Sequence, residues 1–240
     1  MPRIWVAANE LTGTSLVLEG EPHRYLTRVL RLTAGASVEL FDGEGGEVTA
    51  TIERAGTRDL TMALGARRHV PMPSTPPVTL LQGLPRPERM DLVVQKAAEL
   101  GAARVIPVRT ARSAGDQPPR PERWEKIGRE AARQCGRAQL LTIAPTSSLA
   151  EALASLAPET LGVVPWEDAP GAAPLHTLVT GSPRAVAVLI GPEGGLTKDE
   201  VALATDAGFR VATLGPRILR TETAAIAALA VIQSQVGGLG

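Results

Sequence analysis

Four prolines fall within seven residues, from Pro71 to Pro77. Such a segment cannot continue a helix or a central strand, because proline lacks an amide hydrogen and has a fixed φ. We therefore expect a domain boundary here, between residues 1–72 and 73–240. The hydrophobic periodicity also changes across this segment, which predicts two different folds.

The first 70 residues contain short segments in which apolar and polar residues partly alternate, as is typical of β-strands. These segments are Ser15–Leu18, Ser37–Phe41 and Glu47–Ile52. Between the first two, His23–Leu32 carries apolar residues on one helical stripe. Short strands at this spacing predict a small β-barrel or sandwich.

Beyond the prolines, strand-like and helix-like segments alternate. Ala185–Ile190 is continuously apolar, as expected for a strand covered on both faces. Thr197 and Glu200 form a capping-box pattern that opens a helix ending at Gly208. The alternation predicts an α/β domain with a mostly parallel sheet and helices on both faces. The expected strands are 78–82, 105–108, 161–164, 185–190 and 211–214, and the expected helices are 88–100, 121–137, 149–156, 197–208 and 222–236.

Two glycine-containing loops, Gly191–Gly195 and Gly215–Thr223, follow strands that we expect to be neighbours. Parallel α/β sheets bind ligands at the carboxyl ends of their strands, and glycine lets a ligand approach the backbone. The pair of loops could enclose a nucleoside-like group, although each alone is also a common strand-to-helix turn. Neither matches a phosphate-binding glycine motif, which argues against an NTPase or a nicotinamide-dependent oxidoreductase.

The formal net charge of the chain is zero, but residues 75–140 carry 12 basic and 7 acidic side chains, a net charge of +5. Within the expected helix 121–137, four basic side chains share one face. They form either a polyanion-binding surface or an ordinary solvated face. These residues are Lys126, Arg129, Arg133 and Arg137, and a second basic cluster is formed by Arg24, Arg28 and Arg31 on the N-terminal helix.

Several classes of protein are disfavoured. Cys135 is the single cysteine and the three histidines are far apart, so we expect neither a disulfide nor a metal site. Cys135 lies on an apolar stripe and is expected in the core. The apolar run Ala224–Ile232 is too short to cross a bilayer and predicts a buried helix, inside its domain or against another subunit. No secretory signal is visible, so we expect a cytoplasmic protein.

Two motifs carry a family resemblance: Ile190-Gly-Pro-Glu-Gly-Gly-Leu-Thr and Leu214-Gly-Pro-Arg-Ile-Leu-Arg-Thr-Glu-Thr-Ala. They resemble the ribosomal RNA small subunit methyltransferase E family, within the SPOUT class. Gln95–Gly101 and Glu130–Arg137 are similar to other segments of that family. Gln139–Thr142, Pro216 and Leu196 depart from its pattern.

The resemblance implies a PUA-like RNA-binding β-barrel over residues 1–72 and a SPOUT methyltransferase domain with a deep trefoil knot over residues 73–240, acting as a homodimer. It implies methyl transfer from S-adenosylmethionine to N3 of a uridine in 16S rRNA, as part of the small ribosomal subunit, without a metal or a membrane. The loop after Val164 would form a third wall of the cofactor pocket. The implied cofactor-binding residues are Leu189, Ile190, Gly191, Glu193, Gly194, Leu214, Gly215, Ile218, Leu219 and Thr223, and the implied RNA-binding residues are Arg24, Arg28, Arg31, Arg129 and Arg133.

This reaction needs a base for the N3 proton, or a positive group that stabilises the uracil anion. Arg220 is the candidate for the positive group. Glu222 is the candidate base, although an acid in the first turn of a helix more often stabilises the helix dipole. Glu193 is the candidate for orienting a backbone or substrate group.

Three other functions compete with this interpretation. A non-catalytic RNA-binding assembly factor would not need two glycine-rich loops, and affinity for S-adenosylmethionine would count against it. An enzyme that binds ATP or adenosine would need a Mg²⁺ carboxylate pair, and none stands near either loop. A methyltransferase acting on tRNA ribose is disfavoured by the barrel and by the second motif.

Overall fold

The structure is a computed structural model that describes residues 1–114 and 119–239, and its chain forms two compact units. The first unit consists of Met1–Met72 and Ala132–Leu140, and the second of Pro73–Ala131 and Leu141–Gly240. No sequence pattern predicts that Ala132–Leu140 packs within the first unit.

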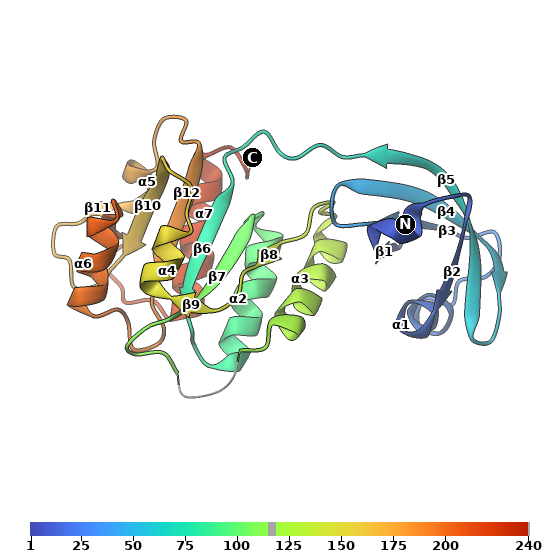
Figure 1. Cartoon of the computed structure of the whole chain (residues 1–240), viewed down its shortest axis with the longest axis horizontal. Helices are drawn as coiled ribbons and strands as arrows, with labels where there is room; N and C mark the ends of the chain where they lie inside the picture. Colours follow the sequence, from blue (N-terminus) through green and yellow to red (C-terminus); the bar gives the residue numbers. More distant parts are fainter. Residues whose placement is uncertain (115–118, 240) are drawn as a thin grey trace. The chain divides into compact units, whose positions relative to one another are not determined.

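The first unit is one curled five-stranded sheet with strand order β1-β3-β4-β5-β2 (Figure 1). β1 is parallel to β3, and the other pairs are antiparallel. Leu16 and Leu18 of β2 are buried between exposed neighbours, which is the two-residue period of a strand with one face in a core. The strands are β1 (Arg3–Trp5), β2 (Ser15–Glu19), β3 (Ser37–Phe41), β4 (Gly46–Ala55) and β5 (Asp59–His69), with a 3-10 turn, η1, at Ala8–Leu11.

The structure corrects two predictions for this unit. The expected helix 23–32 is α1 (Gly20–Arg24) followed by a π-helical turn, η2 (Tyr25–Val29). Arg31 lies beyond this helix with a left-handed φ of 55°, so it is not on the helical face predicted for it. β1 and β5 were not predicted, because β1 has three residues and β5 contains Gly65 and ends in exposed basic residues.

Arg3 connects several parts of the first unit. Its Nε donates to Glu39 Oε1 at 2.8 Å, its Nη2 pairs with Glu47, and its Nη1 donates to the Arg137 carbonyl at 3.3 Å. The guanidinium lies 4.4 Å from the centre of the Phe41 ring. Only 10% of the Arg3 side chain and 5% of the Glu47 side chain are exposed, so this ion pair compensates two charges that are largely removed from water.

The second unit is built on a parallel sheet whose main path runs β11-β13-β10-β12-β6-β7-β8, with β9 beside β7. The strands are β6 (Val78–Gly83), β7 (Arg104–Arg109), β8 (Thr142–Ile143), β9 (Ser147–Ser148), β10 (Thr160–Pro165), β11 (Ala173–Pro174), β12 (Ala185–Ile190) and β13 (Arg210–Thr213). The helices are α2 (Pro87–Glu99), α3 (Pro121–Cys135), α4 (Leu149–Ala154), α5 (Leu175–Leu178), α6 (Lys198–Asp206) and α7 (Thr221–Gln235). The predicted α/β class with a mostly parallel sheet is therefore confirmed.

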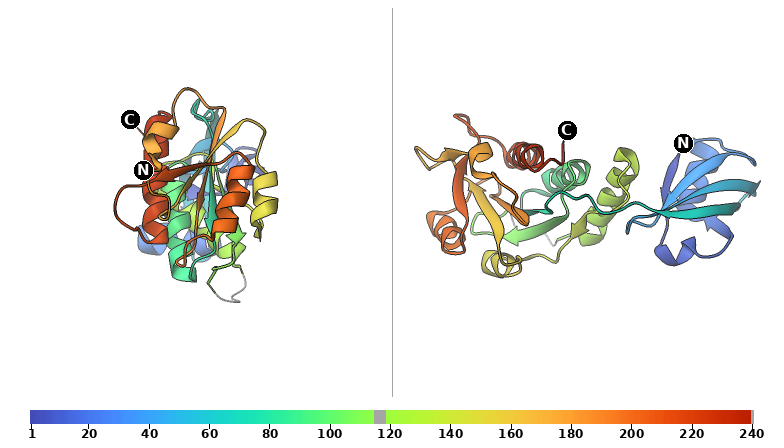
Figure 2. Two further views of the ribbon diagram at one scale, coloured as in Figure 1. Left: turned by 90° about the vertical axis from the view of Figure 1, so that its left-hand side faces the viewer. Right: turned by 90° about the horizontal axis from the view of Figure 1, so that it is seen from above.

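Helices cover both faces of this sheet, with α2, α5 and α7 on one face and α4 and α6 on the other (Figure 2). Each face has its own apolar core. Val188 of β12 faces the first core and Leu189 faces the second, and both are fully buried. This explains the continuously apolar sequence of β12.

Two further predictions are corrected in the helices. α3 ends at Cys135, because Gly136 takes a left-handed φ of 79°, so Arg137 lies outside the helix. Cys135 is exposed and is not a core residue. One side of α7 is buried, including Ala228 and Ile232, while Ile226 and Val231 are only half-buried.

Over the described residues, no helix is both long enough and apolar enough to cross a membrane. Within the same ranges, no group of three or more His, Cys, Asp or Glu side chains is arranged to hold a metal ion.

We expect Arg3→Met to lower the free energy of unfolding by about 3 kcal/mol, because it removes the buried ion pairs to Glu39 and Glu47 and leaves both carboxylates paired with the exposed Arg68. The matched control is Arg68→Met. Arg68 pairs with the same two carboxylates, but its side chain is 62% exposed. Arg68→Met should lower the free energy of unfolding by less than about 1 kcal/mol. Urea unfolding of both variants tests this, and equal losses would contradict it.

Candidate active site

Three loops meet at the carboxyl ends of β10, β12 and β13, and they line a cavity of about 400 Å³. The prediction that β12 and β13 are neighbours is wrong, because β10 lies between them. The loop after β10 consequently fills the middle of this edge, and Pro165 and Trp166 line the cavity. A volume in this range is typical of small-molecule sites.

Most of the residues predicted to bind a cofactor are brought together at this cavity, but three are not. Leu189 is fully buried in a core cluster, and Gly194 and Thr223 are absent from the described lining. The predicted residues that do line the cavity are Ile190, Gly191, Glu193, Leu214, Gly215, Ile218 and Leu219.

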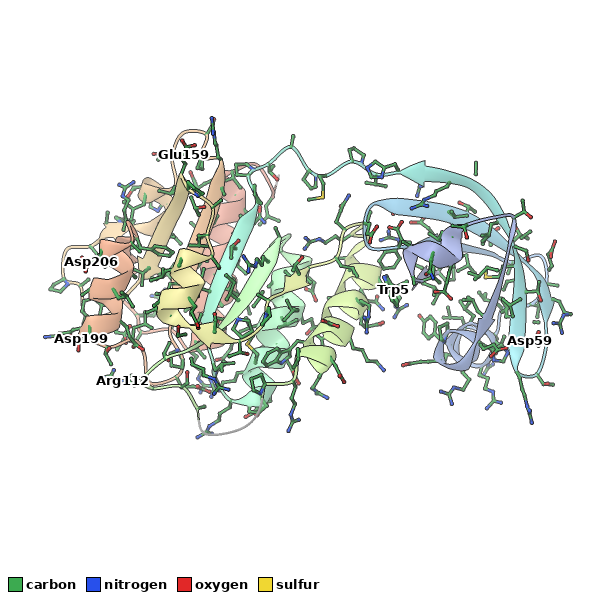
Figure 3. All side chains as sticks on the ribbon, in the orientation of Figure 1. Trp5, Asp59, Arg112, Glu159, Asp199 and Asp206 are labelled. Carbon is green, nitrogen blue, oxygen red and sulfur yellow. The ribbon has the colours of Figure 1, made fainter. Side chains whose placement is uncertain are left out.

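The loop after β12 is held by side chains from outside it. Arg112, in the loop after β7, donates from Nη1 to the Gly194 carbonyl at 2.8 Å. Figure 3 labels Arg112 at the same end of the sheet as Asp199, near the start of α6. Gly195 has a left-handed φ of 71°, a conformation that other residues rarely adopt, so this turn favours glycine. Thr197 and Glu200 form the predicted capping box of α6.

Arg89 of α2 joins the two glycine-containing loops. Its Nε lies 3.2 Å from Glu193 Oε1 in the first loop. Its Nη1 donates to both carboxylate oxygens of Glu222, at 2.9 and 2.7 Å, at the end of the second loop. Glu193 Oε1 also accepts from the Arg86 backbone amide at 3.0 Å. Both acids are therefore engaged by protein groups.

The environment of Glu222 makes it a weak base. Burial alone would raise its pKa, but its own backbone amide, the hydrogen bonds from Arg89 and the charges of Arg89 and Arg220 together lower the pKa below its usual value. The same interaction raises the pKa of Arg89, chiefly through its hydrogen bond to Glu222. The ion pair thus stays charged at neutral pH.

Arg220 lines the cavity and is exposed. It precedes α7 as the N-cap residue, with extended backbone dihedrals, and its side chain does not cap the helix. Across the described chain, the structure gives its guanidinium no hydrogen bond or ion pair, so this charge can contact a ligand.

The basic residues predicted to bind RNA do not form one group within either unit. Arg24 and Arg28 are exposed on the first unit. Arg133, also in the first unit, donates to the Tyr25 hydroxyl at 2.7 Å and lies 4.6 Å from the centre of that ring. Arg129 belongs to the second unit.

Arg89 and Arg112 are not among the site residues predicted from the sequence. Each lies more than 80 residues from the loop it holds, so spacing along the chain carries no sign of these contacts. Arg89 stands in the first turn of a helix, where a cation interacts unfavourably with the helix dipole. This position was the one feature of the sequence that could have indicated a functional role for Arg89.

Comparison with known proteins decides the family. The RNA methyltransferase domain family matches residues 72–233, and the RNA methyltransferase PUA domain family matches residues 18–61. A ribosomal RNA small subunit methyltransferase E from Mycobacterium bovis is 34% identical over 238 residues, covering 92% of this chain and 87% of the relative. The relative of the same name from Bacillus subtilis is 30% identical, covering 91% and 89%.

The chain belongs to the ribosomal RNA small subunit methyltransferase E family. The predicted resemblance is confirmed. The crystal structure of a family member from Neisseria gonorrhoeae, bound to S-adenosyl methionine, superposes with a TM-score of 0.88 at 32% identity, covering 98% of this chain and 97% of that one. A Legionella pneumophila protein in complex with SAM has a TM-score of 0.81 at 33% identity, covering 97% and 96%. The PUA match also agrees with the predicted PUA-like fold of the first unit.

The lowered pKa of Glu222 predicts a pH-dependent contribution to stability. Its ionised form stabilises the folded state above the carboxyl group's ordinary pKa of 4.5, and this contribution is lost as the pH falls through the lower folded-state pKa. We expect the stability difference between wild type and Glu222→Gln to be constant near neutral pH and to disappear on acidification. Urea unfolding across this range measures it.

The control is Glu159→Gln, which removes an exposed ion pair to Arg184 and should change stability little at any pH. A difference for Glu222→Gln that does not vary with pH would contradict the assignment of an ionised, ion-paired Glu222.

Proposed function

We propose that this protein is an S-adenosylmethionine-dependent methyltransferase that methylates N3 of a specific uridine in 16S rRNA. The single observation that carries the proposal is the three-loop cavity at one sheet edge, in a chain whose Neisseria gonorrhoeae relative binds S-adenosyl methionine. The relatives' name supplies the substrate class, small-subunit rRNA.

The residues of the cavity fit this cofactor. Ile190, Leu214 and Leu219 supply apolar walls suited to an adenine ring, and the glycines let it approach the backbone. Ile218 is 83% exposed at this cavity, and a bound nucleoside would cover it. Trp166 also lines the cavity, and its indole ring adds apolar surface.

When bound, S-adenosylmethionine supplies a methyl group already activated by its positively charged sulfur. The protein then has to align uracil N3 with the methyl carbon and the sulfur, so that the N–C bond forms as the C–S bond breaks. The N3 proton must also leave, which in this proposal it does to solvent water, and we assign Arg220 to stabilise the negative charge that remains on the uracil. Since Glu222 is ion-paired and has a lowered pKa, we assign it to positioning and not to proton removal.

We assign RNA binding mainly to a first domain, residues 1–72, and methyl transfer to a second domain, residues 73–240. Exposed Arg24 and Arg28 would contact phosphates, as would Arg31, Arg129 and Arg133. The target base would be flipped out of the folded RNA. We also propose a trefoil knot in the second domain, action on the small subunit in the cytoplasm, and a homodimer, which the half-buried apolar side of α7 supports.

The proposal is tested by incubating the protein with labelled S-adenosylmethionine and small ribosomal subunits that lack the modification. Nucleoside mass spectrometry should detect 3-methyluridine in the 16S rRNA. A parallel reaction with naked 16S rRNA shows whether the substrate is the free rRNA or the assembled small subunit. Cofactor binding without any methylated nucleoside would contradict the substrate assignment, and absence of both would contradict the pocket as well.

We expect Arg220→Ala to reduce methyl transfer by about 100-fold or more, because it removes the group that stabilises the developing charge. The affinity for S-adenosylmethionine should stay near that of the wild type. Rates from single-turnover transfer and affinities from calorimetry check both statements. Arg184→Ala, an exposed arginine elsewhere on this unit, is the control. Loss of cofactor binding in Arg220→Ala would refute the separation of roles.

A further inference from the structure

A buried amide lies beneath the edge of the cavity. Gln82, near the end of β6, has no exposed surface. Its Nε2 donates to Thr221 Oγ1 at 2.9 Å and to the Gly83 carbonyl at 2.9 Å, and lies 3.4 Å from the Gly191 carbonyl oxygen. Thr221 Oγ1 in turn donates to the Gly191 carbonyl at 2.6 Å. Gln82 is thus hydrogen-bonded to segments 109 and 139 residues away in sequence.

This relay meets both glycine-containing loops where each joins regular structure. Gly191 is the first residue after β12, and Thr221 is the first residue of α7. Arg220, the candidate for stabilising the uracil anion, directly precedes Thr221. The first loop is also packed against β6, because a Cβ added to Gly83 would lie 2.7 Å from Pro192 Cδ. A shift at Gln82 would therefore reach Gly191 and Arg220 together.

Stability alone does not explain a glutamine at this position. Its Oε1 is buried and has no hydrogen-bond partner among the residues described. An unpaired buried oxygen is unfavourable, and an apolar side chain of the same shape would avoid it. The amide's useful contribution is its donor group, which fixes the Thr221 hydroxyl so that its proton points to the Gly191 carbonyl.

We propose that Gln82 and Thr221 are positioning residues, which act as one hydrogen-bonded unit to set the cofactor loop and Arg220 in register. The inference rests on the proposed function. It assigns to the buried end of β6 a role in both cofactor affinity and methyl transfer, although Gln82 is not part of the described cavity lining.

Isosteric variants test this on the full chain. Gln82→Met and Thr221→Val each remove the donor with little change in volume, whereas Thr221→Ser keeps the hydroxyl. We expect the first two variants each to weaken binding of S-adenosylhomocysteine and to lower the single-turnover rate by about tenfold, the effect of losing one buried hydrogen bond. Thr221→Ser should stay within about twofold of the wild type, since its hydroxyl can make the same bond.

The double variant Gln82→Met/Thr221→Val distinguishes a unit from two separate contacts. If the residues act together, the affinity and the rate of the double variant should lie within about twofold of those of the more impaired single variant. Losses that multiply would overturn the proposal, as would single variants that bind and react like the wild type.

Ile232→Val, in the buried side of the same helix, controls for a merely structural role. It should lower the melting temperature while leaving affinity and rate unchanged. If Ile232→Val lowers the affinity and the rate in proportion to its loss of stability, the positioning role is refuted. A wild-type protein that does not bind S-adenosylhomocysteine at all would instead refute the proposed function on which this inference rests.

Discussion

Parallel pairing in the middle of the second unit is the constraint on which the candidate site depends. β12 is bonded to β10 on one side and to β6 on the other, and its side chains enter apolar cores on both faces. Because parallel strands all end at the same edge, the loops after β10, β12 and β13 emerge together. The cavity is therefore a consequence of strand order, and its walls come from segments that are far apart in the sequence.

Strand order brings the loops together but does not fix their conformations. That is done by polar side chains that reach the loops from elsewhere in the unit. Arg112 binds the Gly194 carbonyl, and Arg89 engages Glu193 and Glu222 at once. Thr221 and, at a longer distance, Gln82 donate hydrogen bonds to the Gly191 carbonyl. A pre-organised loop loses little conformational freedom when a ligand binds, which favours affinity.

The sequence was sufficient to predict elements whose periodicity reflects burial. β12 and β3 have the predicted bounds, and the α6 capping box forms as expected. Short or interrupted strands such as β1 were missed because they have too few residues for a period to appear. The position of β10 between β12 and β13 was missed because local patterns do not encode strand order. The hydrogen bonds of Gln82 and the ion pairs of Arg89 depend on that order, so they could not be predicted before the fold was known.

We propose that these three loops form one S-adenosylmethionine site. Hydrogen exchange, measured by mass spectrometry on the full chain with and without S-adenosylhomocysteine, tests this proposal. Exchange should slow in peptides covering 165–169, 189–196 and 214–223, with little change in the curled sheet of the first unit. Binding without protection of these three segments, or protection confined to the first unit, would contradict it.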